Sequence, residues 1–220
     1  MHLVKHAVSP EIANALKLGS GILWTLTYLL ILRKARKDKT YGMPMVALGA
    51  NLGWEFLYSF VLPHQNPQLS IDRVWLAFDV LLLWQTLRYG KGEMANPFLH
   101  RWFLPAVGLS VGLGFLVVRG MALDFQDPWG VYSAFGQNLM MSVLFVQMLL
   151  LRGNSRGQSI WIALCKLFGT VLPSILFCMH FPDSQLLPVL YLSILLFDGI
   201  YVALLWSRLR AEGRDPWTVW

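Results

Sequence analysis

The sequence repeats apolar blocks of about 20 residues, separated by short polar segments. A helix needs about 20 apolar residues to cross the hydrocarbon core of a bilayer, so blocks of this length predict transmembrane helices. Only 14% of the 220 residues are charged, against about 25% in a soluble domain, and 56% are hydrophobic. A transmembrane β-barrel would instead show short alternating strands. The sequence therefore predicts an all-α integral membrane protein.

The blocks predict a seven-transmembrane helix bundle that forms a single domain over residues 1–220. The polar segments between the blocks are too short to separate two domains, and they require consecutive helices to lie antiparallel. One of these breaks is expected at the basic run RKARKDK, residues 33–39. We expect the spans at about 12–32, 44–62, 71–89, 102–118, 131–151, 159–180 and 186–206.

Basic residues are divided unequally between the two ends of the predicted bundle. Of the 18 lysines and arginines, 13 flank one end, and only Lys5, Arg73 and Arg119 flank the other. Basic residues concentrate on the cytoplasmic side of membrane proteins. We therefore expect the N-terminus outside and the C-terminus in the cytoplasm. The net charge of +6 then reflects topology and contact with anionic membrane lipid, and no nucleic-acid partner is expected.

Three carboxyl groups fall inside predicted spans, where each ionisable side chain costs a few kcal/mol. Glu55 lies midway along the second span, and Asn51 and Tyr58 share its helix face. Asp79 lies inside the third span and Asp198 midway along the seventh. We expect all three carboxyl groups to point into the bundle with no basic partner at the same depth.

Simpler structural roles compete for these and other polar residues. A buried acid often only joins two helices by a hydrogen bond, and the Asn138 amide could do the same or could line a cavity. Lys17 and Lys166 lie nearer span ends, where their ammonium groups can reach the membrane surface. Cys165 and Cys178 are separated by thirteen residues of one predicted helix, roughly 20 Å, so we expect no disulfide between them.

Buried acids among aromatic side chains suit one particular chemistry. Removal from water favours the neutral form of a carboxyl group, which can then donate a proton. The faces of Trp and Tyr rings stabilise cations without reacting with them. A proton donor in a dry, aromatic cavity fits protonation-initiated terpene cyclisation, but proton transport could use the same groups.

The segment Asn51-Leu52-Gly53-Trp54-Glu55 resembles a motif of the integral-membrane terpene cyclases of meroterpenoid and indole-terpenoid biosynthesis, the paspaline and pyripyropene types. Those enzymes have seven transmembrane helices and a chain of this size. Trp75 and Asp79 resemble the Trp-x-x-x-Asp pattern of their third span, and Asp198 followed by Tyr201 resembles the acid and aromatic of their last span. The similarity in span number and loop length covers nearly the whole chain.

The resemblance implies that Glu55 and Asp198 are the catalytic acids. Glu55 would donate the proton or directly assist its donor, and Asp198 would share or relay that proton. Asp79 and Asn51 would orient them. Supporting residues would also include Tyr58 and Tyr201, and the cation-stabilising aromatics would be Trp54, Trp75 and Phe197.

The resemblance also implies a prenylated small-molecule substrate, supplied by a prenyltransferase and often carrying a terminal epoxide made by a separate epoxidase. No cofactor or metal is expected. The short N-terminus and loops suggest a bacterial member, which leaves open whether the enzyme protonates an epoxide or an alkene. The expected location is the bacterial inner membrane or the fungal endoplasmic reticulum.

Other membrane proteins fit the sequence less well. A proton-coupled small-solute transporter is the main alternative, although the first and last three spans show no convincing repeat. A retinal protein would need a lysine deep in the last span, and residues 186–206 contain none. A prenyltransferase would need clustered aspartates for magnesium diphosphate, and Asp124 and Asp127 form only an isolated pair.

Overall fold

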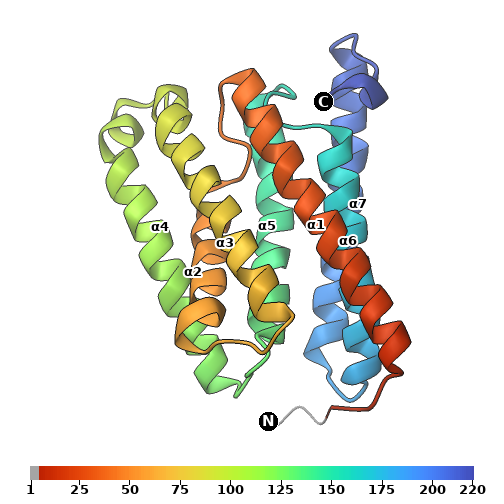
Figure 1. Cartoon of the computed structure of the whole chain (residues 1–220). Coiled ribbons are helices and arrows are strands. Elements are labelled where there is room, and N and C mark those ends of the chain that lie inside the picture. Colours follow the sequence, from red (N-terminus) through yellow and green to blue (C-terminus); the bar gives the residue numbers. More distant parts are fainter. Residues whose placement is uncertain (1–4) are drawn as a thin grey trace.

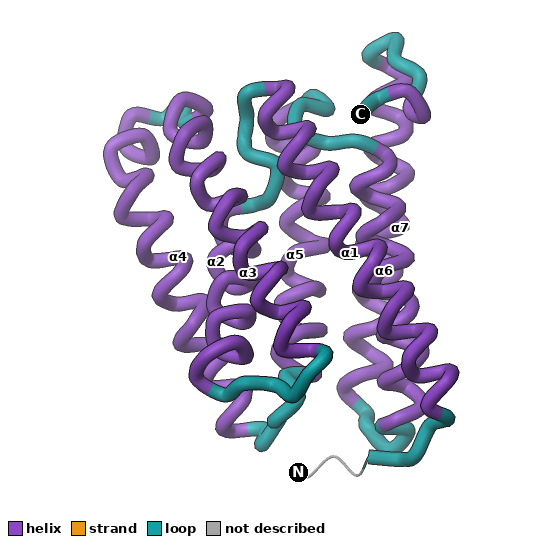
Figure 2. Tube along the Cα trace, in the orientation of Figure 1, coloured by secondary structure: helices purple, strands orange, loops and turns teal. Residues whose placement is uncertain are grey.

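The computed structural model describes residues 5–220, which form seven α-helices and no β-strand (Figures 1 and 2). Helices α2 and α3 each continue into a short π-helical turn, at Leu57–Val61 and Thr86–Gly90. Consecutive helices run in opposite directions, as the short connections predict (Figure 1). The helices are α1 (Pro10–Asp38), α2 (Met45–Phe56), α3 (Gln68–Gln85), α4 (Pro97–Asp124), α5 (Val131–Arg152), α6 (Ile160–His180) and α7 (Leu186–Ala211).

Five of these helices, α1 and α4 to α7, are long and apolar enough to cross a membrane. Helix α2 has 12 residues, and α3 carries three charged residues among its 18. Each of the seven apolar blocks coincides with one helix, so the predicted all-α architecture is confirmed within the described residues.

The predicted bounds of two helices are wrong. The basic run at 33–39 does not interrupt the first helix, because α1 continues to Asp38 and Lys39 caps it with φ at 51°. Lysine and arginine are good helix formers, and their charges interact favourably with the C-terminal end of a helix. Helix α4 extends beyond the expected 102–118 at both ends, and the Asn96 side chain caps its start by accepting from the Phe98 N–H at 2.9 Å.

The helices form two groups, with α2, α3 and α4 on one side, α1, α6 and α7 on the other, and α5 between them (Figure 1). Helices α2 and α4 approach closely because glycines face each other across the contact. A Cβ atom on Gly53 would lie 2.5 Å from the backbone N of Phe115. Small residues allow helix backbones to approach in this way inside membranes.

The main apolar core lies toward the end of the bundle that holds connections 39–44 and 153–159. Tyr28, Leu48 and Phe145 belong to it, and each is at most 2% exposed. Toward the opposite end the helices separate around a cavity. The packed core therefore closes one end of the cavity.

Candidate active site

A cavity of about 620 Å³ lies between the two helix groups. Its volume falls within the range of roughly 300–1,000 Å³ that is typical of ligand sites. Side chains of α1, α2, α3, α5 and α6 line it, and it reaches the connections at 63–67 and 128–130. Its aromatic lining comprises Trp24, Tyr28, Trp54, Trp75, Trp129, Phe135, Phe177 and Phe181.

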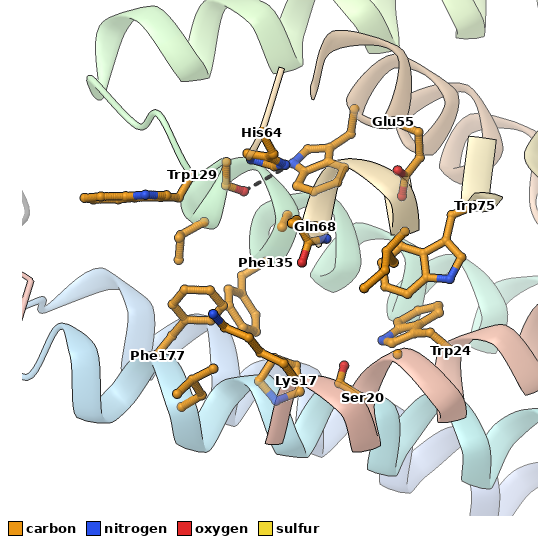
Figure 3. A pocket seen from close by; sticks show the side chains of 18 of the residues that line it. Lys17, Ser20, Trp24, Glu55, His64, Gln68, Trp75, Trp129, Phe135 and Phe177 are labelled. Carbon is orange, nitrogen blue, oxygen red and sulfur yellow. Dashed lines mark hydrogen bonds between the residues drawn. The ribbon is translucent and has the colours of Figure 1, made fainter. Parts of the chain in front are cut away.

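Glu55 supplies the only carboxyl group among the described residues that line this cavity. The residue is 3% exposed, and its Oε2 has no hydrogen-bond partner within residues 5–220. Figure 3 shows the carboxyl group pointing into the cavity on the same side as Trp75. The second span therefore places Glu55 where the sequence predicts an acid facing an aromatic chamber.

Asn51, one turn before Glu55, connects three helices. Its Nδ2 donates to Asp79 Oδ2 of α3 at 2.9 Å and to the Tyr28 hydroxyl of α1. Asn51 and Tyr28 line the cavity, whereas Asp79 is fully buried outside the lining. Asp79 thus contacts Asn51, one helical turn from Glu55, but does not face the cavity itself.

Two indole rings of the cavity wall are held by hydrogen bonds. The Trp54 Nε1–H donates to Ser133 Oγ at 3.1 Å and to the Gly130 carbonyl at 3.2 Å. The Trp75 Nε1–H donates to Thr25 Oγ1 at 3.2 Å. With their N–H groups engaged by neighbouring segments, both rings line the cavity.

Asp198 lies outside this cavity and has a basic partner. Lys166 Nζ is 2.7 Å from Asp198 Oδ1 and 3.0 Å from Oδ2, and it also donates to Ser142 Oγ at 2.7 Å. Both charged residues are 1% exposed. The prediction that no basic residue lies at the depth of Asp198 is therefore wrong, and so is the prediction that Lys166 reaches the membrane surface.

The reason is lateral packing, which span positions alone do not reveal. Lysine has a long flexible side chain, and a buried ammonium group needs a carboxylate and hydrogen-bond acceptors. Helix α6 packs against α7, and α5 packs against α7 as well, so Asp198 and Ser142 both come within reach of Lys166. Lys17, in contrast, lines the cavity.

A chain of hydrogen bonds leads from this ion pair to the cavity wall. Ser142 Oγ donates to the Asn138 carbonyl at 2.9 Å, and Asn138 Nδ2 donates to Thr170 Oγ1 at 2.9 Å. Asn138 and Thr170 both line the cavity. Asp198 is thus connected to the site through Lys166 without facing it.

Three other predicted site residues also lie outside the lining. The Tyr58 hydroxyl donates to the Asp127 carbonyl at 3.1 Å. The Tyr201 hydroxyl donates to Gln158 Oε1 at 3.0 Å, and Phe197 is half-buried. The structure therefore brings Glu55 together with Asn51 and two tryptophans, and separates it from the residues of the seventh helix.

Sequence reasoning missed a buried histidine–aspartate pair at the edge of the cavity. His64 Nδ1 lies 2.7 Å from Asp72 Oδ2, and Gln68 Nε2 donates to Asp72 Oδ1 at 2.7 Å. His64 and Gln68 line the cavity. The four-residue spacing of Gln68 and Asp72, which places them on one helix face, indicates their contact. No sequence pattern connects His64 to them, because it lies in the polar connection before α3.

Comparison with known proteins decides the class. The family described as Pyr4-like transmembrane terpene cyclases matches residues 6–211. The chain belongs to this family. Since its members are terpene cyclases, the chain is a non-redox enzyme of the cyclase class and a multi-pass membrane protein, and the transporter alternative is not supported.

Individual relatives of the Pyr4-like cyclase family agree along most of the chain. The Pyr4-family terpene cyclase mfmH of Annulohypoxylon moriforme is 29% identical over 199 residues, which cover 88% of this chain and 82% of the relative. Asnovolin H synthase nvfL of Aspergillus novofumigatus is 30% identical, covering 73% and 67%. Terpene cyclase pyr4 of Aspergillus fumigatus is 27% identical, covering 93% and 90%. No solved structure matches the chain.

Groups of three or more His, Cys, Asp or Glu side chains that could hold a metal ion do not occur among residues 5–220 of this cyclase. The two cysteines lie in α6 as free thiols. Among the described residues that line the cavity, the carboxyl and basic groups are the Glu55 carboxyl group and the side-chain nitrogens of Lys5, Lys17, His64 and His180.

Proposed function

We propose that the chain protonates the terminal epoxide or alkene of a prenylated meroterpenoid or indole-terpenoid substrate and directs the carbocation polycyclisation that follows. The observation that carries this proposal is the position of Glu55, a carboxyl group almost fully buried in a cavity walled by aromatic rings. A buried carboxyl group without a counter-ion favours its neutral form and can act as a general acid.

The surroundings of Glu55 suit the cations that protonation would generate. Trp75 lies on the same side of the cavity as Glu55, and Trp24 lies beside Trp75 on the α1 wall (Figure 3). Their π faces attract positive charge, and the apolar walls exclude water that would otherwise capture the cation. An apolar prenyl chain also partitions readily into such a site from the bilayer.

The acceptor part of the substrate would occupy the other region of the cavity. Lys17 extends into the cavity from α1 near Phe177, on the opposite side from Glu55 (Figure 3). Gln68 lies near the middle of the cavity, between this region and Glu55 (Figure 3). Polar groups here can bind an aromatic or peptidic head while the prenyl terminus reaches Glu55.

In this proposal Asp198 is a positioning residue. Its carboxylate is engaged by Lys166, so it does not donate a proton to the substrate directly. It holds Lys166 and Ser142 in place behind Asn138, and thereby fixes one wall of the cavity.

We also propose the orientation that the basic residues predict, with the N-terminus outside and the C-terminus cytoplasmic. The cavity would then open toward the side of the membrane facing away from the cytoplasm. A prenyltransferase and an epoxidase would supply the substrate. The expected bacterial membership stays a prediction.

A product assay tests the proposed function. Membranes containing the protein are given a farnesylated phenol, with and without a terminal epoxide, and the products are separated by chromatography and mass spectrometry. We expect a product of unchanged mass with fewer double bonds or without the epoxide. Proton-coupled solute uptake in vesicles, without any such isomer, would overturn the proposal.

A further inference from the structure

His64 is held at the edge of the cavity by contacts on three sides. Its backbone N–H donates to the Tyr58 carbonyl at 3.1 Å. Its ring stacks on Tyr58 with centroids 4.5 Å apart and planes 6° from parallel, and the Trp54 ring lies 5.6 Å away. The side chain is 8% exposed. The imidazole is therefore fixed in one orientation.

The Asp72 carboxylate determines which ring nitrogen carries the proton. Asp72 is fully buried, and its two oxygens accept from His64 and Gln68. An ionised carboxylate can only accept hydrogen bonds, so Nδ1 of His64 must be the donor. In the neutral ring the lone pair is then on Nε2, and this atom has no hydrogen-bond partner within residues 5–220.

A buried nitrogen without a partner is costly, and such groups often have a chemical role. His64 and Glu55 lie along the same wall of the cavity, facing Lys17 and Ser20 on the opposite wall (Figure 3). Trp54, which lies next to Glu55 in the sequence, contacts His64 through its ring. The Glu55 carboxyl group and the His64 imidazole therefore line one wall of the same cavity.

We propose that His64 is the base that ends the cyclisation, and that Asp72 and Gln68 are its positioning residues. This inference rests on the proposed cyclase function. Once the last ring has closed, Nε2 takes a proton from the carbon next to the cationic centre. The electron pair of that C–H bond forms the new C=C double bond.

Positive charge passes in this step from carbon to the imidazolium, which the Asp72 carboxylate stabilises at 2.7 Å. One proton has entered from Glu55 and one leaves on His64, so the product is an isomer of the substrate. The imidazolium then releases its proton to solvent, from which Glu55 is reprotonated. No oxidant, reductant or metal is needed for the balance.

The test compares the products of His64→Gln with those of wild type, using whichever farnesylated phenol the wild type cyclises. We expect His64→Gln to consume substrate within tenfold of the wild-type rate, because initiation still uses Glu55. The wild-type product should fall below half of the total. Double-bond isomers from other proton losses, or alcohols 18 mass units heavier from water capture, should replace it.

Two further variants sharpen the test. In Asp72→Asn the amide can donate to Nδ1, which moves the ring proton to Nε2 and leaves no lone pair there to accept a proton. The same change in products is therefore expected, and this variant provides the test if His64→Gln does not fold. His100→Gln, an exposed histidine at the start of α4, is the matched control and should leave the products unchanged.

An unaltered product distribution in folded His64→Gln or Asp72→Asn would overturn the inference. So would complete loss of substrate consumption in a variant that retains wild-type thermal stability, because a terminal base is not needed for initiation. Failure of the wild type to cyclise any prenylated substrate would instead contradict the proposed function itself.

Discussion

Lys166 Nζ and Asp198 Oδ1 lie 2.7 Å apart, and both residues are 1% exposed. The pair joins α6 to α7, and Ser142 extends it to α5. Removing one partner from a buried ion pair leaves an uncompensated charge, whereas removing both can be nearly neutral. The positioning role proposed for Asp198 must therefore be tested separately from its contribution to stability.

Single substitutions of this pair should destabilise the bundle. We expect Lys166→Met and Asp198→Leu each to lower the free energy of unfolding by about 3 kcal/mol in detergent, and the double variant Lys166→Met/Asp198→Leu to lose clearly less than their sum. Chemical denaturation followed by tryptophan fluorescence measures all three. Additive losses would show that the two charges are not energetically coupled.

The close contact of α2 with α4 predicts a sharp difference between two glycines. Gly53→Ala should lower stability by about 1–3 kcal/mol, because its Cβ would lie 2.7 Å from Phe115 Cα. Gly112→Ala on α4 is the matched control. Nothing lies within 4 Å of its Cβ, so it should be neutral or slightly stabilising. Equal losses in the two variants would contradict the glycine-mediated packing. Thermal unfolding in detergent provides the measurement.

Asp79 should tolerate loss of its charge but not of its hydrogen bond. Asp79→Asn keeps an oxygen that can accept from Asn51, and we expect it to retain more than a tenth of the wild-type cyclisation rate. Asp79→Leu leaves the Asn51 amide without this acceptor and should cost about 1–3 kcal/mol of stability. If Asp79→Asn is folded yet inactive, Asp79 has a role in proton transfer beyond this contact.

Asp127, in the connection between α4 and α5, should make stability depend on pH. Burial raises the pKa of this carboxyl group above its ordinary value of about 3.9, although the backbone N–H donors around it, including that of Tyr132, lower the pKa. The native state therefore binds a proton more tightly than the unfolded state. Stability contributed by this group is fully present below the ordinary pKa and is lost as pH rises through the raised native value.

The slope from this single proton cannot exceed about 1.4 kcal/mol per pH unit. Asp127→Asn should flatten the pH dependence of unfolding in mildly acidic detergent solution, while the exposed Asp183→Asn should not. A slope that is the same in Asp127→Asn and wild type would show that other groups determine it.

The sequence predicts the helices well because length and apolarity determine them directly. It also predicts Glu55 and Asn51 on the cavity wall, because their four-residue spacing places them on one helix face, whereas Trp54 follows only from the family resemblance. Trp75 follows from the resemblance of the third span to the family motif.

Contacts between helices could not be predicted in the same way. Whether Asp198 faces the cavity or Lys166 depends on how α6 and α7 are rotated and how deep each residue lies, and apolar blocks do not specify either. His64 and Asp72 meet only because connection 63–67 folds back over the start of α3. A histidine in a polar connection gives no sign of such a contact.

The most direct test of the central claim is the rate at which Glu55→Gln cyclises the substrate used by the wild type. Glutamine keeps the size of the side chain but cannot donate an acidic proton, so we expect a loss of at least about 100-fold. The unfolding midpoint should remain close to that of wild type, and the exposed Glu11→Gln should keep full activity. Cyclisation by Glu55→Gln at the wild-type rate would contradict the assignment of Glu55 as the proton donor.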